Sequence, residues 1–153
     1  FYPTPVDQAD DADWDRLLHS NLRAPFILSQ KLAGALRQQQ GSIINIVDVY
    51  AEKPLQNHTL YCMAKAGLAM MTRSLARELG PDIRVNGVSP GPILWPEAGQ
   101  MNQQEIQDAT ALKRCGTPQD IAGTVWWLGT QAPFITGQIL AVDGGRSLTL
   151  QGS

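Results

Sequence analysis

The chain has 153 residues, of which 43% are hydrophobic and 17% charged, and this composition predicts a packed domain, or part of one, rather than disorder. A formal net charge of −2 argues against a nucleic-acid or anionic membrane surface, and no apolar run approaches the roughly 20 residues that span a bilayer. The two cysteines and two histidines favour a reducing compartment and predict neither a disulfide framework nor a metal site.

The first half of the chain predicts a helix at 10–37, a strand at 42–47, a loop at 48–58 and a second helix at 59–79. Acidic residues open the first helix, where the helix dipole favours them, and Pro25 is expected to kink or break it. The strand is short, β-branched and apolar on both faces, which is typical of a buried parallel strand. Gly80 and Pro81 end the second helix.

The second half continues the alternation with a strand at 83–88, a loop at 89–99 and a weak helix at 101–112. A stronger helix begins at Pro118, and a last strand follows at 139–142. Thr117 is a typical N-cap for the stronger helix, with Pro118 in its first turn. Alternating helices and strands predict an α/β fold with a parallel sheet, in which ligands bind beyond the carboxyl ends of the strands. We therefore expect a site between the loops at 48–58 and 89–99.

A tyrosine and a lysine share one face at the start of the second helix. Tyr61 and Lys65 are four residues apart, which is about one helical turn. A phenol is a poor acid near neutral pH because its pKa is about 10, and an ammonium group beside it favours the phenolate and lowers that pKa. Asp48 directly follows the preceding strand, thirteen residues before Tyr61. These three residues are the candidates for proton transfer.

Further residues accompany this trio along the chain: Asn21, Val85-Asn86-Gly87-Val88-Ser89-Pro90-Gly91, Ile135-Thr136-Gly137-Gln138 and Val142-Asp143-Gly144-Gly145. In order and spacing, these segments resemble the short-chain dehydrogenase/reductase family, and the resemblance covers essentially all of the chain. It implies an α/β, Rossmann-type doubly wound parallel sheet. It also implies that residues 1–153 form the catalytic C-terminal portion of a single domain of that family.

The resemblance implies a role for each of these residues. Tyr61 is the proton donor, and Lys65 lowers the pKa of Tyr61 and holds the nicotinamide ribose. Asn21 anchors a water-linked proton relay. The residues implied on the nicotinamide side of the cofactor are Pro90, Gly91 and Ile93. The resemblance further implies a cytoplasmic homotetramer, built through the helices at 10–37 and 59–79.

Asp48 departs from the family pattern, because most members carry a serine there that hydrogen-bonds the substrate carbonyl. A carboxylate cannot donate a hydrogen bond unless it is protonated, but it suits a nitrogen-rich substrate whose ring nitrogens receive protons. The pteridine reductases of the family are similar here, and also at Phe1-Tyr2-Pro3-Thr4-Pro5, at 89–96 and at Asn45-Ile46-Val47-Asp48 followed by Lys53-Pro54-Leu55. This subgroup implies NADPH-dependent reduction of dihydropterins, extending to dihydrofolate or fully oxidised pterins, with Asp48 and Tyr61 protonating the pterin.

The same subgroup implies an aromatic contact with the substrate. Phe1 matches a phenylalanine that stacks on the pterin, which lies between that ring and the nicotinamide, and flat heteroaromatic rings gain from such stacking. Further candidates for lining the substrate pocket are Tyr50 and Trp95. His58, three residues before Tyr61, is expected to be a loop residue rather than an acid.

The sequence has no Gly-rich turn of the kind that seats a cofactor pyrophosphate on a helix N-terminus. In the family that turn lies in the first βαβαβ half, on the order of 100 residues upstream of the active-site strand. We therefore expect a fragment that lacks this half and has an incomplete sheet with an exposed apolar edge. Such a fragment by itself should neither bind dinucleotide tightly nor catalyse.

Two other functions remain open. One is another carbonyl-reducing member of the family, acting on a sugar, steroid or acyl-carrier substrate, and Asp48 argues against it. Enoyl reductases are disfavoured because their tyrosine and lysine are spaced more widely than Tyr61 and Lys65. The other is a non-catalytic nucleotide-binding protein on the same fold, against which the intact set of Tyr61, Lys65 and Asn21 argues.

Overall fold

The computed structural model describes residues 1–93 and 103–149. Its elements in chain order are α1 (Asp11–Leu18), the π-helical turn η1 (His19–Arg23), α2 (Ala24–Gln38), β1 (Ser42–Ile46), the 3-10 turn η2 (Val49–Ala51), α3 (Thr59–Leu79), β2 (Arg84–Pro90), α4 (Gln103–Asp108), α5 (Pro118–Thr130), β3 (Ile139–Val142) and α6 (Arg146–Thr149). The predicted alternation of helices and strands is confirmed.

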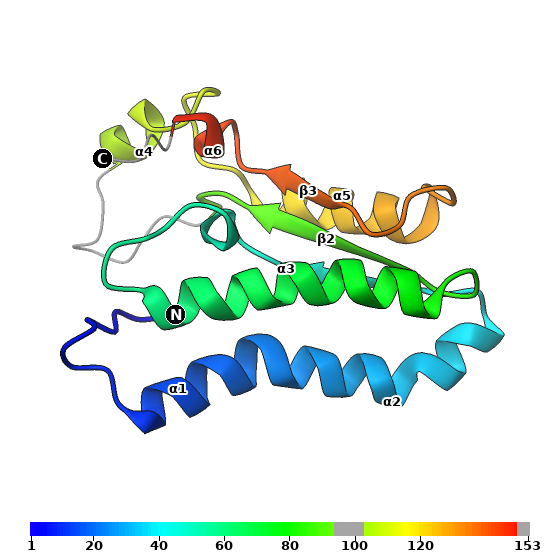
Figure 1. Ribbon diagram of the computed structural model, residues 1–153. Coiled ribbons are helices and arrows are strands. Elements are labelled where there is room, and N and C mark those ends of the chain that lie inside the picture. The colour runs from blue at the N-terminus through cyan, green and yellow to red at the C-terminus, as the bar shows by residue number, and fades with distance from the viewer. Residues whose placement is uncertain (94–102, 150–153) are drawn as a thin grey trace.

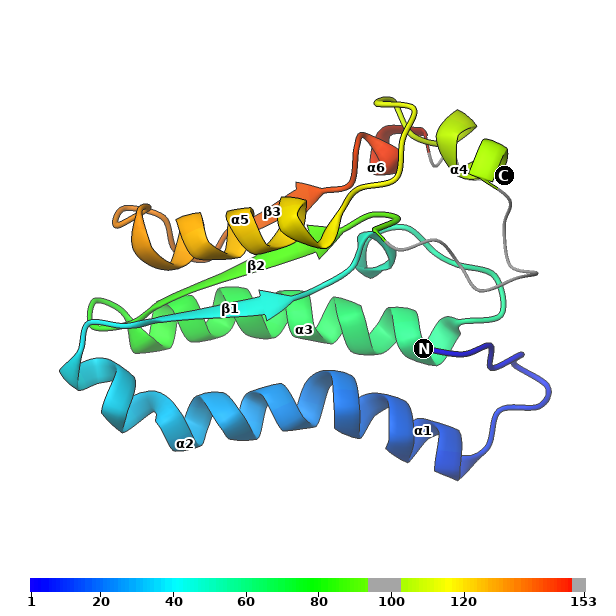
Figure 2. The ribbon, with the colours of Figure 1, turned by 180° about the vertical axis from the view of Figure 1, so that it is seen from behind.

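The three strands form one parallel sheet in the order β1-β2-β3. The long helices α1, α2 and α3 lie on one face of this sheet and α5 lies on the other, as Figures 1 and 2 show from opposite sides. The α/β doubly wound class is therefore confirmed. Among the described residues β1 pairs with β2 alone, so its other edge has no strand partner there.

The central strand β2 is buried along most of its length because both helical layers cover it. Val85 packs with α3 residues on one face, and Val88 packs against Leu128 of α5 on the other. Arg84 opens the strand, and its guanidinium donates hydrogen bonds to the carbonyls of Leu128 and Gly129 in the last turn of α5 and of Ala132 just after it. These last carbonyls of a helix have no partner within the helix, so Arg84 both satisfies them and ties α5 to the sheet.

The helical segment that contains Pro25 continues through the proline. Pro25 lies in the first turn of α2, and the chain before it widens into the π-helical turn His19–Arg23, where the N–H of Ala24 donates to the carbonyl of His19. A proline has no N–H and its ring clashes with the carbonyl four residues earlier. The wider turn accommodates that carbonyl, which belongs to Asn21, so the expected kink or break takes the form of a local π-helical turn.

Several element boundaries differ from the prediction. The loop at 48–58 contains the turn η2, β2 runs two residues further, to Pro90, and the weak helix ends at Asp108 rather than at residue 112. The short helix α6 was not predicted. Within 1–93 and 103–149, the structure contains no helix of the length and apolarity needed to cross a membrane.

Candidate active site

The site lies where β1 ends and α3 begins. Asp48 follows β1, and the pairing of the strands continues beside it, since the N–H of Val47 donates to the carbonyl of Val88 at 2.7 Å. Oδ1 of Asp48 accepts the N–H of Tyr50 at 3.0 Å, which caps the turn η2. The carboxylate is thus held in place by the backbone that follows it, with Oδ2 directed to Tyr61.

Tyr61 lies in the first turn of α3, and its side chain is 6% exposed. Its hydroxyl donates a hydrogen bond to Oδ2 of Asp48 at 2.6 Å. This length is typical of a hydrogen bond to an ionised oxygen. The two residues that the sequence placed thirteen positions apart are therefore in direct contact, with the phenol as the donor.

The pKa of Tyr61 is raised well above the ordinary tyrosine value, first because the ring is buried and then because the hydroxyl bonds to the negative Asp48. Burial disfavours a phenolate, and a neighbouring carboxylate disfavours it further. The pKa of Tyr61 is therefore shifted upward overall, and the lowering expected from Lys65 stays a prediction. Asp48 bonds directly to the hydroxyl, and its charge acts in the opposite direction.

Lys65 follows one turn later on the same helix face. Its Nζ donates to the carbonyl of Ile46 at 3.0 Å and lies 5.6 Å from the centroid of the Tyr61 ring. Burial lowers the pKa of Lys65, while the negative charge of Asp48 opposes that effect. The ammonium group is therefore held at the end of β1, over the tyrosine ring.

Phe1 is brought to the site by the segment that precedes α1. Its ring meets the Tyr61 ring edge-on, with centroids 4.7 Å apart, and stacks on the imidazole of His58. Phe1 remains 64% exposed. Tyr50 is half-buried beside Asp48 and contributes electrostatically to the raised pKa of Tyr61. Phe1 therefore lies beside Tyr61 and Tyr50 beside Asp48, and their contact with a substrate stays a prediction.

Asn21 lies in the π-helical turn, and its side-chain amide is engaged within its own helix. The amide donates to the carbonyl of Leu17 at 3.0 Å and to Oγ of Ser20 at 3.1 Å. The proton relay expected at Asn21 stays a prediction.

The end of β2 carries the residues expected on the nicotinamide side. Gly91 packs closely on the end of β3: a Cβ there would lie 2.6 Å from Cα of Asp143, and its N–H donates to the carbonyl of Val142 at 3.1 Å. The absence of a side chain at Gly91 is thus required by strand packing. Ile93 lines a pocket of about 440 Å³, and Pro90 ends the strand. Trp95 lies outside the described residues.

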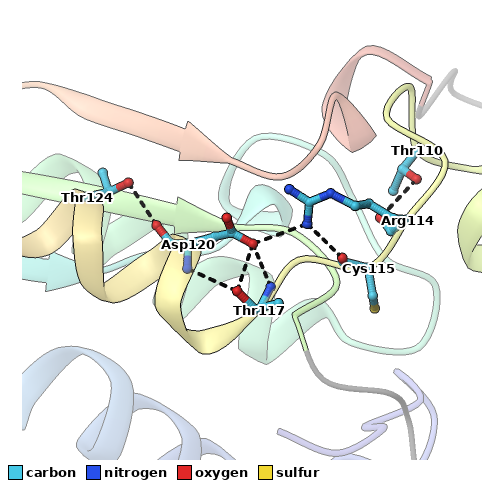
Figure 3. Close-up of polar contacts among 6 residues, drawn as sticks. All are labelled: Thr110, Arg114, Cys115, Thr117, Asp120 and Thr124. Carbon is cyan, nitrogen blue, oxygen red and sulfur yellow. Dashed lines mark hydrogen bonds and ion pairs between the residues drawn. The ribbon is translucent and has the colours of Figure 1, made fainter.

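A polar network borders this pocket at the start of α5, and Figure 3 shows it. Thr117 and Asp120 form a capping box, and Arg114 contacts Oδ2 of Asp120 at 3.2 Å. Hydrogen bonds from the backbone of Thr117, then from Arg114, lower the pKa of Asp120. The sequence indicated a helix start over Thr117 to Asp120, with Thr117 as the cap. It missed Arg114, to which no local pattern points.

The described side chains fit one end of a nicotinamide cofactor. Lys65 places an ammonium donor beside Tyr61 at the carboxyl edge of the sheet, which suits the hydroxyl groups of a ribose. The chain contains no Gly-rich turn for a pyrophosphate. No group of three or more His, Cys, Asp or Glu residues that could hold a metal ion occurs within the described ranges.

Fold and site together define a doubly wound α/β protein with a Tyr–Lys pair at the carboxyl ends of its parallel strands. A family model described as "Enoyl-(Acyl carrier protein) reductase" matches residues 2–147. The chain belongs to the short-chain dehydrogenase/reductase family. Because its relatives act on varied substrates, this match defines the family and not the substrate.

Three similar proteins illustrate the range of the family. L-xylulose reductase of Caenorhabditis elegans is 37% identical over 152 residues, covering 93% of this chain and 60% of that protein. Pteridine reductase 1 of Leishmania tarentolae is 35% identical over 174 residues, covering 97% and 60%. The crystal structure of a blue fluorescent protein from a metagenomic library in complex with NADPH has a TM-score of 0.86 at 36% identity, covering 95% and 61%. The chain spans about three fifths of the length of these relatives.

Proposed function

We propose that the protein carrying this chain reduces pterins with NADPH, from dihydropterin to tetrahydropterin and extending to dihydrofolate. The observation that carries the proposal is the hydrogen bond between Tyr61 and Asp48 at 2.6 Å. It puts a carboxylate, and not a hydroxyl donor, beside the proton-donating phenol. A carboxylate would repel the alkoxide that forms when a ketone is reduced, but it attracts the N–H groups of a nitrogen heterocycle.

Tyr61 and Asp48 divide the proton chemistry between them. Asp48 accepts hydrogen bonds from the heterocycle and stabilises it as it gains a proton, and the Tyr61 hydroxyl donates that proton to a ring nitrogen. Lys65, whose ammonium lies 5.6 Å from the tyrosine ring centroid, stabilises the phenolate that forms. A substrate that donates hydrogen bonds to the Asp48 carboxylate competes with the bond from Tyr61. The influence of Asp48 on the pKa of Tyr61 is then weaker, and the phenol becomes a better acid.

The cofactor supplies a hydride when it is bound. Lys65 and Tyr61 would hold its ribose, and Pro90, Gly91 and Ile93 would lie on its nicotinamide side. The pyrophosphate requires a segment other than these 153 residues, so we propose that the chain is the catalytic C-terminal portion of a single domain. The NADPH complex of a protein similar to this chain supports NADPH as the nucleotide, and the pteridine reductase relative supports the substrate class.

We further propose a cytoplasmic homotetramer assembled through the long helices. The helices that the resemblance assigns to the interface expose large apolar side chains, namely Leu28, Leu32, Met63 and Met70. Such side chains on neighbouring helices are suited to burial against another subunit. Both cysteines are free thiols, which is consistent with a reducing compartment.

A substrate panel tests the proposal. The whole protein that carries this chain is offered dihydrobiopterin, dihydrofolate, biopterin and simple ketones, with NADPH or NADH, and the loss of cofactor absorbance is followed. We expect turnover of the dihydropterin with NADPH. Turnover of the ketones alone would overturn the pterin assignment in favour of a carbonyl reductase, a function that the xylulose reductase relative supports. No turnover of any substrate, with nucleotide still bound, would favour the non-catalytic alternative.

A further inference from the structure

We propose that His58 is a positioning residue that sets the preference of the site for flat substrates, by holding the Phe1 ring against the edge of Tyr61. The Phe1 and His58 rings are stacked, with centroids 4.7 Å apart and planes 18° apart, while Phe1 meets Tyr61 at 75°. The three rings are in contact in the order His58, Phe1, Tyr61. This inference rests on the proposed function for the identity of the flat substrate.

The imidazole of His58 is itself held in place. Its Nδ1 lies 2.8 Å from the carbonyl of Gln56, and a carbonyl accepts only, so Nδ1 carries the proton and donates. The backbone N–H of His58 also donates to the carbonyl of Leu55 at 3.1 Å. A ring whose hydrogen bond fixes its orientation is a firm support for a second ring stacked upon it.

The choice of residue at this position has a structural cost. His58 is the N-cap of α3, yet its side chain makes no capping hydrogen bond. The caps of α1 and α5, Asp10 and Thr117, both form complete capping boxes. Ser, Thr, Asp or Asn would cap α3 better than histidine. The imidazole of His58 stacks on Phe1 instead.

The segment that carries Phe1 is tied down separately. The N–H of Thr4 donates to the carbonyl of Asn57 at 2.6 Å, and the Tyr2 hydroxyl donates to Oδ1 of Asp13 at 2.9 Å. These two bonds bring the segment to the site but do not touch the ring of Phe1. The ring of Phe1 is instead positioned by its contacts with His58 and Tyr61, and only His58 supports its face. With 64% of Phe1 exposed, the ring has surface left to receive a flat substrate.

Kinetics of the whole protein test the specificity role. The variants are His58→Ser, which can cap α3 but not stack, His58→Phe, which can stack but not cap, and His19→Ser as the control at the other histidine. Substrates are dihydrobiopterin and a pair of ketones, one aryl and one alkyl. For His58→Ser we expect KM for the flat substrates to rise roughly 2- to 10-fold with a smaller change for the alkyl ketone and an unchanged or higher melting temperature. His58→Phe should restore the preference, and His19→Ser should leave it unchanged.

A second measurement does not depend on pterin turnover. With 13Cε1-labelled histidine, the resonance lost in His58→Ser identifies His58, and stacking on Phe1 should displace it by the ring current. Phe1→Leu should remove that displacement. A displaced resonance without pterin turnover overturns the proposed function but confirms the stack, and the aryl and alkyl ketones then decide the preference. An undisplaced resonance, or equal changes in KM for flat and alkyl substrates, overturns the role of His58.

Discussion

The hydroxyl of Tyr61 donates to Oδ2 of Asp48 at 2.6 Å, and this bond joins the first turn of α3 to the end of β1. After burial of the ring, this bond is the next cause that raises the pKa of Tyr61. The active-site tyrosine therefore rests in a state that resists ionisation. A substrate that engages Asp48 relieves part of that resistance, which couples substrate binding to the acidity of the proton donor.

Replacement of Asp48 should exchange one substrate class for the other. For Asp48→Ser we expect kcat/KM with dihydrobiopterin to fall by about 10²- to 10⁴-fold, the usual contribution of a positioned acid or base, and turnover of a simple ketone to rise, since serine donates a hydrogen bond. Steady-state kinetics measure both. The matched control is Asp82→Ser, which removes an exposed aspartate paired with Arg37 at 3.2 Å. Undiminished pterin turnover in Asp48→Ser would remove the reason for the pterin assignment.

Titration of Tyr61 should affect stability only at alkaline pH. Burial, and then the Asp48 hydrogen bond, raise the pKa of Tyr61 above its unfolded value, which is about 10. The folded protein then binds more protons than the unfolded one above pH ~10, so stability is fully present below that pH and is lost as the pH rises towards the folded pKa. Denaturant unfolding from neutral to alkaline pH checks this. Tyr61→Phe should flatten the profile, whereas an unchanged profile in that variant would contradict the assignment.

Asp48→Asn should lower the pKa of Tyr61 but leave it above the usual value, because burial is the larger cause of the shift. Tyrosinate absorbance, with Tyr61→Phe subtracted, gives the titration directly. A pKa in Asp48→Asn equal to that of the wild type would show that the carboxylate exerts no influence on the phenol.

The glycine at the end of β2 should be needed for packing even without cofactor. In Gly91→Ala the new Cβ would lie 2.6 Å from the backbone of Asp143, and overpacking of this kind typically costs 1–3 kcal/mol. In Gly123→Ala, within α5, nothing lies within 4 Å of the new Cβ, and alanine in a helix interior gains up to about 1 kcal/mol. In urea unfolding without nucleotide, the free energy of unfolding should therefore fall in Gly91→Ala and rise in Gly123→Ala. A stable Gly91→Ala that loses only NADPH affinity would assign Gly91 to the cofactor instead.

The cap of α5 offers a test of helix capping at the border of the pocket. Thr117 accepts the N–H of Asp120, and Asp120 bonds back to the N–H of Thr117 at 2.8 Å, as Figure 3 shows. Thr117→Ala should lower the free energy of unfolding by about 1 kcal/mol. Thr117→Ser keeps the hydroxyl and should change it much less. Both are measured by urea unfolding, and equal losses in the two variants would show that the methyl group, and not the hydrogen bond, matters.

Patterns within short stretches of sequence predicted most of the fold. The strand at 42–47 and the helix at 59–79 were recognised because apolar spacing and helix-ending residues report local structure directly. The sequence patterns failed at the element boundaries and at Pro25, where a π-helical turn replaces the expected break. A single proline indicates a conflict in the helix but not how the backbone resolves it.

The sequence by itself determined the family, the order of the elements and the three candidate residues Asp48, Tyr61 and Lys65, because each depends on residue type and short spacing. Only the tertiary structure decided the direction in which the pKa of Tyr61 shifts, since burial and the position of Asp48 depend on the packing of α3 against β1. Only the tertiary structure showed that Phe1 stacks on His58, 57 positions away in the sequence. Such contacts arise from how distant segments meet, and no local pattern encodes them.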